Sequence, residues 1–359
     1  MKNTKLLIVY IFIVAFAISY FLSVNNNKEA GVPPFKNIIK TKTEKENKPE
    51  TVEEIRTFTL SAAGDCTIGW DTNFSVSKRF DQVFKENNND YSYFFKNVVD
   101  IFKSDDLTYV NLEGTFTNHN VKVEKKFNFK APPSYVNILK EGDIEVVGVA
   151  NNHSYDYGET GYNETLKTLK DNNIDYFGYD NYLIKEVNGL KIGFFGLIDI
   201  NARKYTEVKK AIDFLKNNDC DIIIAAMHWG IEKDYNETQA QINLGHYMID
   251  NGVDLVIGTH PHVIQGIEKY KNKYIIYSLA NFSFGGNNNP TDKDTFIFQQ
   301  TFTFINDQLV DDNNIKIIPA TISSTKKYNN YQPTPTSGAD TERVINKILK
   351  KSINFDYKI

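Results

Sequence analysis

The chain has 359 residues, 41% of them hydrophobic, and a formal net charge of -4 at pH 7. This length and apolar content are enough to bury one large core or two modest ones. The slight negative charge excludes the dense Lys and Arg clusters that neutralise nucleic-acid phosphates, so we expect a globular protein that binds no nucleic acid.

The first predicted element is a membrane-spanning helix over residues 6–24, which read LLIVYIFIVAFAISYFLSV. About 20 apolar residues cross a bilayer, whereas the apolar stretch of a cleavable signal peptide is about 7–15 residues long and leads to a site of small residues. Here Tyr20, Phe21 and Leu22 lie near the end of the run. Because Lys2 and Lys5 precede it, the positive-inside tendency places the amino terminus in the cytoplasm and the rest of the chain outside. We predict an uncleaved signal anchor, with a cleaved signal peptide as the alternative.

Residues 25–56 mix Lys, Glu, Asn, Thr and Pro and predict a flexible stalk. Beyond the stalk, apolar strand-like runs alternate with amphipathic helical patterns, which is typical of an α/β domain. The predicted strands are residues 57–63, 107–112, 145–149, 191–197, 221–227 and 254–257. The predicted helices are residues 93–102, 134–139, 161–171, 206–217 and 238–250.

The rest of the domain is predicted to be mostly antiparallel. Residues 263–270 and 274–279 flank Lys271-Asn272-Lys273, a short hairpin signal, and residues 296–305 and 315–323 predict two more strands. Residues 340–350 predict a terminal helix. The chain is therefore expected to comprise an anchor (1–24), a stalk (25–56), a main domain (57–323) and a carboxyl-terminal extension (324–359).

Polar residues follow these predicted strands where the strands end, and four of the six histidines are among them. The residues at strand ends are Asp65, Glu113, Asn152, His153, His228, His260 and His262. Loops at the carboxyl ends of strands line the ligand crevice of open α/β sheets, so these positions are expected to converge. A lone Asp, Asn or His there is usually a turn former or a packed side chain. Together they form the ligand set that Zn, Mn or Fe accepts, and they predict a divalent-metal site.

Six short motifs occur in order along residues 58–284. They are Gly64-Asp65, Asn111-Leu112-Glu113-Gly114, Ala150-Asn151-Asn152-His153 followed by Asp156 and Gly158, His228-Trp229-Gly230, Gly258-Thr259-His260-Pro261-His262, and Ser278-Leu279-Ala280-Asn281-Phe282. Together they resemble the capsule-synthesis CapA/PgsA family, the poly-γ-glutamate synthesis accessory proteins, which is similar to the calcineurin-like metallophosphoesterases. The resemblance implies a metallophosphoesterase-like layered β-sandwich flanked by helices, carried outside the cell by a single amino-terminal transmembrane helix.

The resemblance also implies roles for the residues of the site. Metal-ligand positions are matched by Asp65, Glu113, Asn152, His228, His260 and His262, and the catalytic position is matched by His153. Asp156, three residues further on, is expected to orient that imidazole. The match departs at Thr67, where a histidine ligand would stand, and at Glu113, where a shorter carboxylate is usual. One or two divalent ions of Mn, Zn or Fe are therefore expected.

The expected function is that of an extracytoplasmic capsule synthesis or export protein with a hydrolase-like metal site. Its scissile bond would be a phosphoester or a γ-glutamyl amide. One alternative is a non-catalytic scaffold that binds the polyanionic capsule polymer. The four lysines in residues 122–130 are candidate contacts for that polymer, although a solvated charged loop explains them too. Another alternative is a metallophosphoesterase unrelated to capsule. Expected partners are the capsule polymer, a membrane-embedded synthesis complex and the membrane.

Overall fold

The computed structural model of the protein describes residues 53–73, 77–310 and 314–358. The predicted anchor at residues 6–24 and nearly all of the predicted stalk lie outside these ranges. Within them, no helix has both the length and the apolar character needed to cross a membrane.

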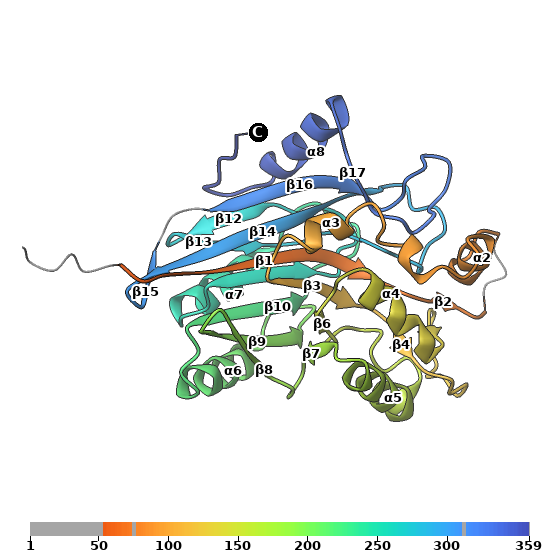
Figure 1. Cartoon of the computed structure of the whole chain (residues 1–359), viewed down its shortest axis with the longest axis horizontal. Helices are drawn as coiled ribbons and strands as arrows, with labels where there is room; N and C mark the ends of the chain where they lie inside the picture. Colours follow the sequence, from red (N-terminus) through yellow and green to blue (C-terminus); the bar gives the residue numbers. More distant parts are fainter. Residues whose placement is uncertain (1–52, 74–76, 311–313, 359) are drawn as a thin grey trace, which may run out of the picture. The chain divides into compact units, whose positions relative to one another are not determined.

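The first sheet has eight strands among the described residues, in the order β17-β16-β14-β1-β3-β6-β7 with β15 paired to β14 (Figure 1). Its parallel half consists of β1 (Ile55–Cys66), β3 (Leu107–Leu112), β6 (Val146–Gly148) and β7 (Asp175–Phe177). Its antiparallel half adds β14 (Asp294–Ile305), β15 (Gln308–Val310), β16 (Ile315–Thr321) and β17 (Thr334–Pro335). The four parallel strands therefore end at one edge.

The second sheet has the order β12-β13-β11-β10-β9-β8. Four of its strands are parallel, namely β9 (Leu190–Ile198), β10 (Ile222–His228), β11 (Leu255–Thr259) and β13 (Lys273–Ile276). The edge strands β8 (Leu183–Val187) and β12 (Ile267–Tyr270) are antiparallel to their neighbours. A small third sheet joins β2 (Trp70–Asp71), β5 (Phe129–Ala131) and β4 (Thr115–Phe116).

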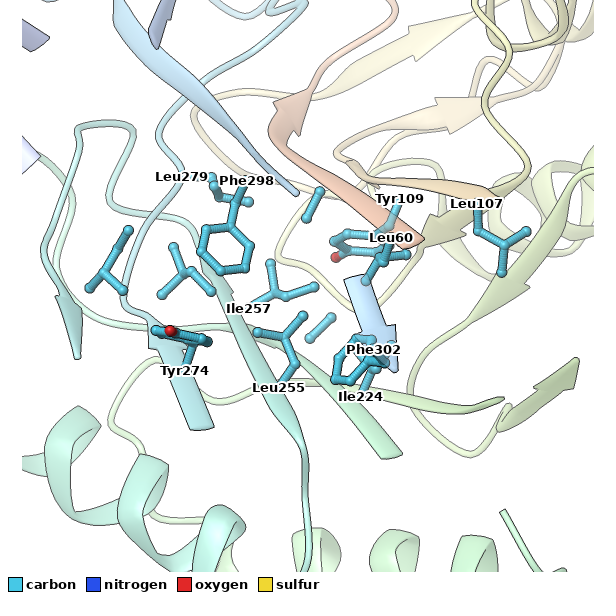
Figure 2. Packing of buried hydrophobic residues seen from close by; sticks show 14 of the residues in the cluster. Leu60, Leu107, Tyr109, Ile224, Leu255, Ile257, Tyr274, Leu279, Phe298 and Phe302 are labelled. Carbon is cyan, nitrogen blue, oxygen red and sulfur yellow. The ribbon is translucent and has the colours of Figure 1, made fainter. Parts of the chain in front are cut away.

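The two large sheets pack face to face around one hydrophobic core. Side chains alternate between the two faces of a strand, so Leu107 and Tyr109 of β3 enter this core while Val110 and Leu112 enter another one. Figure 2 shows part of the core between the sheets, where Leu60 and Tyr109 of the first sheet gather with Ile224, Leu255 and Ile257 of the second. Both sheets are thus buried on their inner faces.

Helices cover the outer face of each sheet. On the first sheet lie α2 (Phe80–Glu86), α3 (Val99–Phe102), α4 (Val136–Glu141) and α5 (Gly158–Asp171), and on the second lie α6 (Tyr205–Asn217) and α7 (Gln239–Asp250). The last helix, α8 (Ala339–Leu349), adds Val344, Ile345 and Ile348 to the core between the sheets. The α/β class is confirmed, with a helix-sheet-sheet-helix order of layers.

Most predicted elements are present, with ends that differ by a few residues. The helix predicted at residues 93–102 is wrong for most of its length, because only α3 is helical and a 3₁₀ turn, Tyr91–Tyr93, precedes it. The apolar spacing there arises from Phe94, Phe95 and Val98, which are buried on irregular turns. Asn97, between them, donates hydrogen bonds to Gln332 and Thr334, so distant contacts override the helical periodicity.

Candidate metal centre

The predicted site residues meet where the parallel strands of both sheets end. Asp65 lies near the end of β1 and Glu113 follows β3, while His228 ends β10 in the other sheet. Asn152 and His153 follow β6, and His260 and His262 follow β11. Because the carboxyl ends of parallel strands share an edge, the fold gathers these side chains from segments far apart in sequence.

Glu113 lies at the middle of this cluster. Its side chain is fully buried, and neither carboxylate oxygen has a hydrogen-bond partner among the described residues. Its Oε1 lies 3.9 Å from Nε2 of each of His153, His228 and His262. Burial and the negative charge of Asp65 raise the pKa of Glu113 to about 8. Since metal ions sit about 2 Å from nitrogen and oxygen ligands, this spacing and the unpaired carboxylate both fit a bound cation.

Asp65 and His262 form the first group of potential ligands with Glu113. Oδ2 of Asp65 lies 3.3 Å from Nδ1 of His262, and one ligand atom from each of the three residues lies within 4.8 Å of the others. Asn111 donates a hydrogen bond of 2.7 Å to Oδ1 of Asp65. Burial tends to raise the pKa of Asp65, but the hydrogen bond and charge of His262 lower it overall. Burial lowers the pKa of His262, but Glu113 and Asp65 outweigh this effect and raise it to about 9.

His228, Asn152 and His260 form the second group. Nε2 of His228 lies 2.8 Å from Oδ1 of Asn152 and 3.1 Å from Nδ1 of His260. Burial lowers the pKa of His228 well below its usual value, and burial together with the charge of His262 lowers the pKa of His260 to about 4. Both imidazoles are therefore neutral near pH 7, and a neutral imidazole has the free lone pair that a metal requires.

Asp156, which was predicted to orient His153, contacts this imidazole. Its Nδ1 lies 2.7 Å from Oδ2 of the buried Asp156, and its ring lies 4.3 Å from that of Phe129. Burial lowers the pKa of His153, although Asp156 opposes the shift. Lys125 forms an ion pair with Asp156 and donates a hydrogen bond to the carbonyl of Asn152. Nε2 of His153 is therefore free to face Glu113 and the centre of the cluster.

Two of the four lysines that were predicted to contact the polymer form an ion pair or hydrogen bonds with other residues of this chain. Lys125 is held by Asp156, and Lys130 donates hydrogen bonds to the carbonyl of His119 and to Oδ1 of Asn120. Lys122 and Lys126 are exposed. Polymer binding through this segment stays a prediction. Of the histidines left out of the site, His246 on α7 pairs with Glu268 instead.

Sequence reasoning missed two residues of the cluster. Glu232 lies in the loop after β10, and its carboxylate forms a further group of potential metal ligands with His260 and His262, all ligand atoms lying within 4.8 Å of one another. The only sequence feature that could have indicated Glu232 as a site residue was its position four residues after His228. Asn281, whose Oδ1 lies 2.9 Å from Nδ1 of His262, was part of one of the six motifs but was given no role. It fixes the orientation of that imidazole.

The chain is similar in sequence to bacterial capsule synthesis proteins over the segment that contains these residues. A family model described as bacterial capsule synthesis protein PGA_cap matches residues 59–286, which is more than half of the chain and includes every residue of the cluster. The capsule biosynthesis protein CapA of Bacillus anthracis is 30% identical over 221 residues, covering 54% of this chain and 54% of that protein. The PGA biosynthesis protein CapA of Bacillus subtilis (strain 168) is 30% identical over 213 residues, covering 53% of this chain and 56% of that protein.

The matched part of the chain thus spans about half the length of these curated relatives. Among solved structures, a hypothetical protein from Thermus thermophilus is 14% identical with a TM-score of 0.46, covering 73% of this chain and 98% of that chain. This likeness is too distant to bear on function.

Proposed function

Since this chain belongs to the bacterial capsule synthesis protein family, we propose that it acts in the synthesis or export of a poly-γ-glutamate capsule through a hydrolase-like divalent-metal centre. The names of its relatives in two Bacillus species support the capsule role. The motifs and the layered sheets also support a metallophosphoesterase type of fold. The activity, substrate and partners of the whole protein are part of this proposal.

The observation that carries the proposal is the buried carboxylate of Glu113. An ionisable group with no hydrogen-bond partner is costly to bury, and three imidazole nitrogens lie 3.9 Å from it. The residues that would hold an ion are Asp65, Glu113, Asn152, His228, His260 and His262. When bound, Mn, Zn or Fe would supply Lewis acidity to a phosphoryl or carbonyl oxygen and would lower the pKa of a water molecule.

His153 is assigned the role of proton donor to the leaving group. Because burial lowers the pKa of this imidazole, Nε2 would first take up the proton that the attacking water molecule releases. The contact between its Nδ1 and Asp156 fixes the ring, so that Nε2 faces the cluster. Lys125 balances the charge of the buried Asp156, and the ring of Phe129 packs against the imidazole. The bond to be hydrolysed is a phosphoester or a γ-glutamyl amide.

The apolar run at residues 6–24 supports a further part of the proposal. We assign it as a single-pass anchor that leaves the rest of the chain outside the membrane, near a membrane-embedded synthesis complex. In this position the centre would meet the capsule polymer as it leaves the cell.

The proposed hydrolase activity can be tested with the full chain loaded with Mn²⁺ or Zn²⁺. The probes are bis(p-nitrophenyl) phosphate and a γ-linked glutamate oligomer, and we expect cleavage of at least one of them. His153→Ala should lower kcat by about 100-fold or more without loss of bound metal, because general acid catalysis contributes about 10²–10⁴-fold.

His119→Ala is the matched control, since His119 lies outside the cluster and should leave kcat unchanged. Equal turnover by the wild type and His153→Ala would contradict the role of His153. A metal-loaded wild type that cleaves neither probe would favour a polymer-binding scaffold.

A further inference from the structure

We propose that the loop at residues 121–127 enters the surface of an anionic lipid bilayer and so holds the edge of the domain that carries the metal centre against the membrane. This inference rests on the membrane location proposed above, but it adds a contact that neither the anchor nor the chemistry of the centre requires. The 121–127 loop lies between β4 and β5, and each of its residues, VKVEKKF, is exposed. It therefore presents its side chains to a partner rather than to the core.

Exposed apolar side chains gather at the edge where the centre lies. Single exposed apolar residues are normal on a protein surface, whereas several together mark an interaction surface. Of the eleven large apolar side chains that are exposed among the described residues, seven lie in loops that follow strands at this edge. Three of these, Val121, Val123 and Phe127, belong to the 121–127 loop, and the others follow β6, β9 and β10. This edge therefore suits a partner that is itself partly apolar.

The base of the 121–127 loop is tied to residues 152–156, the segment that carries Asn152 and His153. The amide of Val123 donates a hydrogen bond of 3.0 Å to the carbonyl of Asp156. The side chain of the buried Asn128 donates hydrogen bonds to the carbonyls of Val123, at 3.2 Å, and of Asp156, at 3.3 Å. The position of the loop is therefore fixed relative to the centre, and a surface that the loop enters must lie beside the centre.

A second exposed apolar pair lies on the side of the centre that the second sheet provides. Ile231, in the loop after β10, is 55% exposed, and Ile200, in the loop after β9, is 36% exposed. The amide of Gly230 donates a hydrogen bond of 3.2 Å to the carbonyl of Ile200, and the amide of Lys233 donates one of 2.8 Å to the carbonyl of Pro261. The centre therefore has exposed apolar side chains on both of its sides, as expected of an edge that meets an extended surface.

Charge complementarity favours an anionic lipid surface as the partner. The 121–127 loop contains three lysines and one glutamate, and Lys122 and Lys126 are exposed next to Val121 and Phe127. Segments that lie in a membrane interface combine apolar side chains that enter the headgroup region with cations that stay at its anionic surface. A polyanionic polymer would contact the lysines but would leave the side chain of Val121, which is 71% exposed, in water.

The length of chain that precedes the domain allows this contact. β1 runs for 12 residues from Ile55 toward the edge where the centre lies, a length of about 40 Å. Residues 25–54, between the predicted anchor and β1, could extend over at most about 100 Å. The anchor and the 121–127 loop could therefore reach the same bilayer.

The test follows the environment of the loop in the full chain, reconstituted in vesicles of phosphatidylcholine alone or of phosphatidylcholine and phosphatidylglycerol in equal parts. A nitrobenzoxadiazole label is attached to Val121→Cys in a Cys220→Ser background, in which the remaining Cys66 is buried. With phosphatidylglycerol present, we expect the emission of the label to shift to shorter wavelength and to be quenched by brominated lipids. Ile184→Cys is the matched control, because Ile184 is exposed on β8 and pairs with Gly193 near the start of β9, the end of that sheet opposite the centre.

Charge reversal tests the contribution of the lysines. The double substitution Lys122→Glu and Lys126→Glu should abolish the shift of the label at position 121, and high salt should weaken the shift because it screens exposed charges. The double substitution Lys103→Glu and Lys140→Glu is the control. It changes the net charge equally at exposed positions on the outer face of the first sheet and should leave the shift unchanged.

The possible outcomes separate this inference from the proposed function. A chain that floats with both kinds of vesicle while its label at position 121 stays in water would overturn this inference and leave the anchor and the metal centre standing. A shift caused by soluble poly-γ-glutamate and not by vesicles would assign the loop to the polymer and overturn the membrane contact. A chain that floats with neither kind of vesicle would overturn both this inference and the proposed membrane location.

Discussion

At the scale of single residues, Glu113 and Glu268 differ in a way that separates a ligand from a structural carboxylate. Both are buried, but Glu113 has no hydrogen-bond partner among the described residues. Glu268 contacts Nε2 of His246 at 2.8 Å and accepts a hydrogen bond of 2.5 Å from the hydroxyl of Tyr277. Replacing these two carboxyl groups with apolar side chains should therefore have opposite effects on stability.

We predict that Glu113→Met raises the free energy of unfolding of the metal-free chain by roughly 1–3 kcal/mol, because it replaces an unpaired buried polar group with an apolar side chain of similar length. Chemical denaturation of the chelator-stripped protein at pH 7 measures this change. The control, Glu268→Met, should lower the free energy of unfolding by a similar amount, because it leaves His246 and Tyr277 without their partner. Equal destabilisation by both substitutions would mean that Glu113 is an ordinary structural carboxylate.

At the scale of elements, ion pairs as well as apolar contacts attach α8 to the first sheet. Arg343 donates two hydrogen bonds, of 2.6 and 2.8 Å, to the two oxygens of Asp294 on β14, and Lys347 adds a third of 2.8 Å. Burial tends to raise the pKa of Asp294, but these cations outweigh it and lower the pKa below its usual value. The attachment of α8 should therefore weaken in acid.

Asp294→Asn is predicted to lower the free energy of unfolding at pH 7 by about 2 kcal/mol, as expected for hydrogen bonds to a charged group. A carboxyl whose folded pKa is lowered stabilises the protein above its unfolded pKa of about 3.9, and this stability is lost as the pH falls through the folded pKa. The difference between wild type and variant should therefore shrink below about pH 3.9. Urea denaturation between pH 7 and pH 2.5 measures it.

Asp340→Asn is the control for that experiment. Asp340 pairs with Arg343 at 3.2 Å, but its side chain is 45% exposed, so its loss should cost less than about 1 kcal/mol. A difference between wild type and Asp294→Asn that stays constant from pH 7 to pH 2.5 would contradict the assigned role of the ion pairs.

Elements with continuous apolar runs were the ones that the sequence predicted well. The strand predicted at residues 107–112 coincides with β3, because a strand buried on both faces carries few polar residues. The short strands β2, β4 and β5 were missed, since two or three residues are too few for any periodicity. The helix predicted at residues 93–102 was wrong for another reason. Its apolar residues recur at the intervals expected for one face of a helix, but they are buried on irregular turns.

At the scale of the whole molecule, the centre joins the two sheets. Asp65 and Glu113 come from the first sheet, whereas His228 and His260 come from the second. Strand-end positions and the recurrence of histidine there led to these residues in the sequence, because parallel strands place their following loops at one edge, and the family resemblance implied their roles as ligands. Lys125 and Glu232 were not assigned to the site, since they lie in irregular loops whose path depends on tertiary contacts.

A bound ion would therefore crosslink the sandwich at the edge where both sheets end. A ligand that binds only the folded state adds about 2.7 kcal/mol of stability at a free concentration of 100 times its Kd. Saturating Mn²⁺ or Zn²⁺ should thus raise the midpoint of thermal unfolding of the stripped chain.

We expect this fold to hold a divalent ion at Glu113. Elemental analysis of the full chain, purified without chelators and again after titration of the stripped protein with Mn²⁺ or Zn²⁺, measures the bound metal. At least one divalent ion per chain is expected, with the content falling strongly in Glu113→Gln. A folded chain that carries no metal and binds none on titration would contradict it.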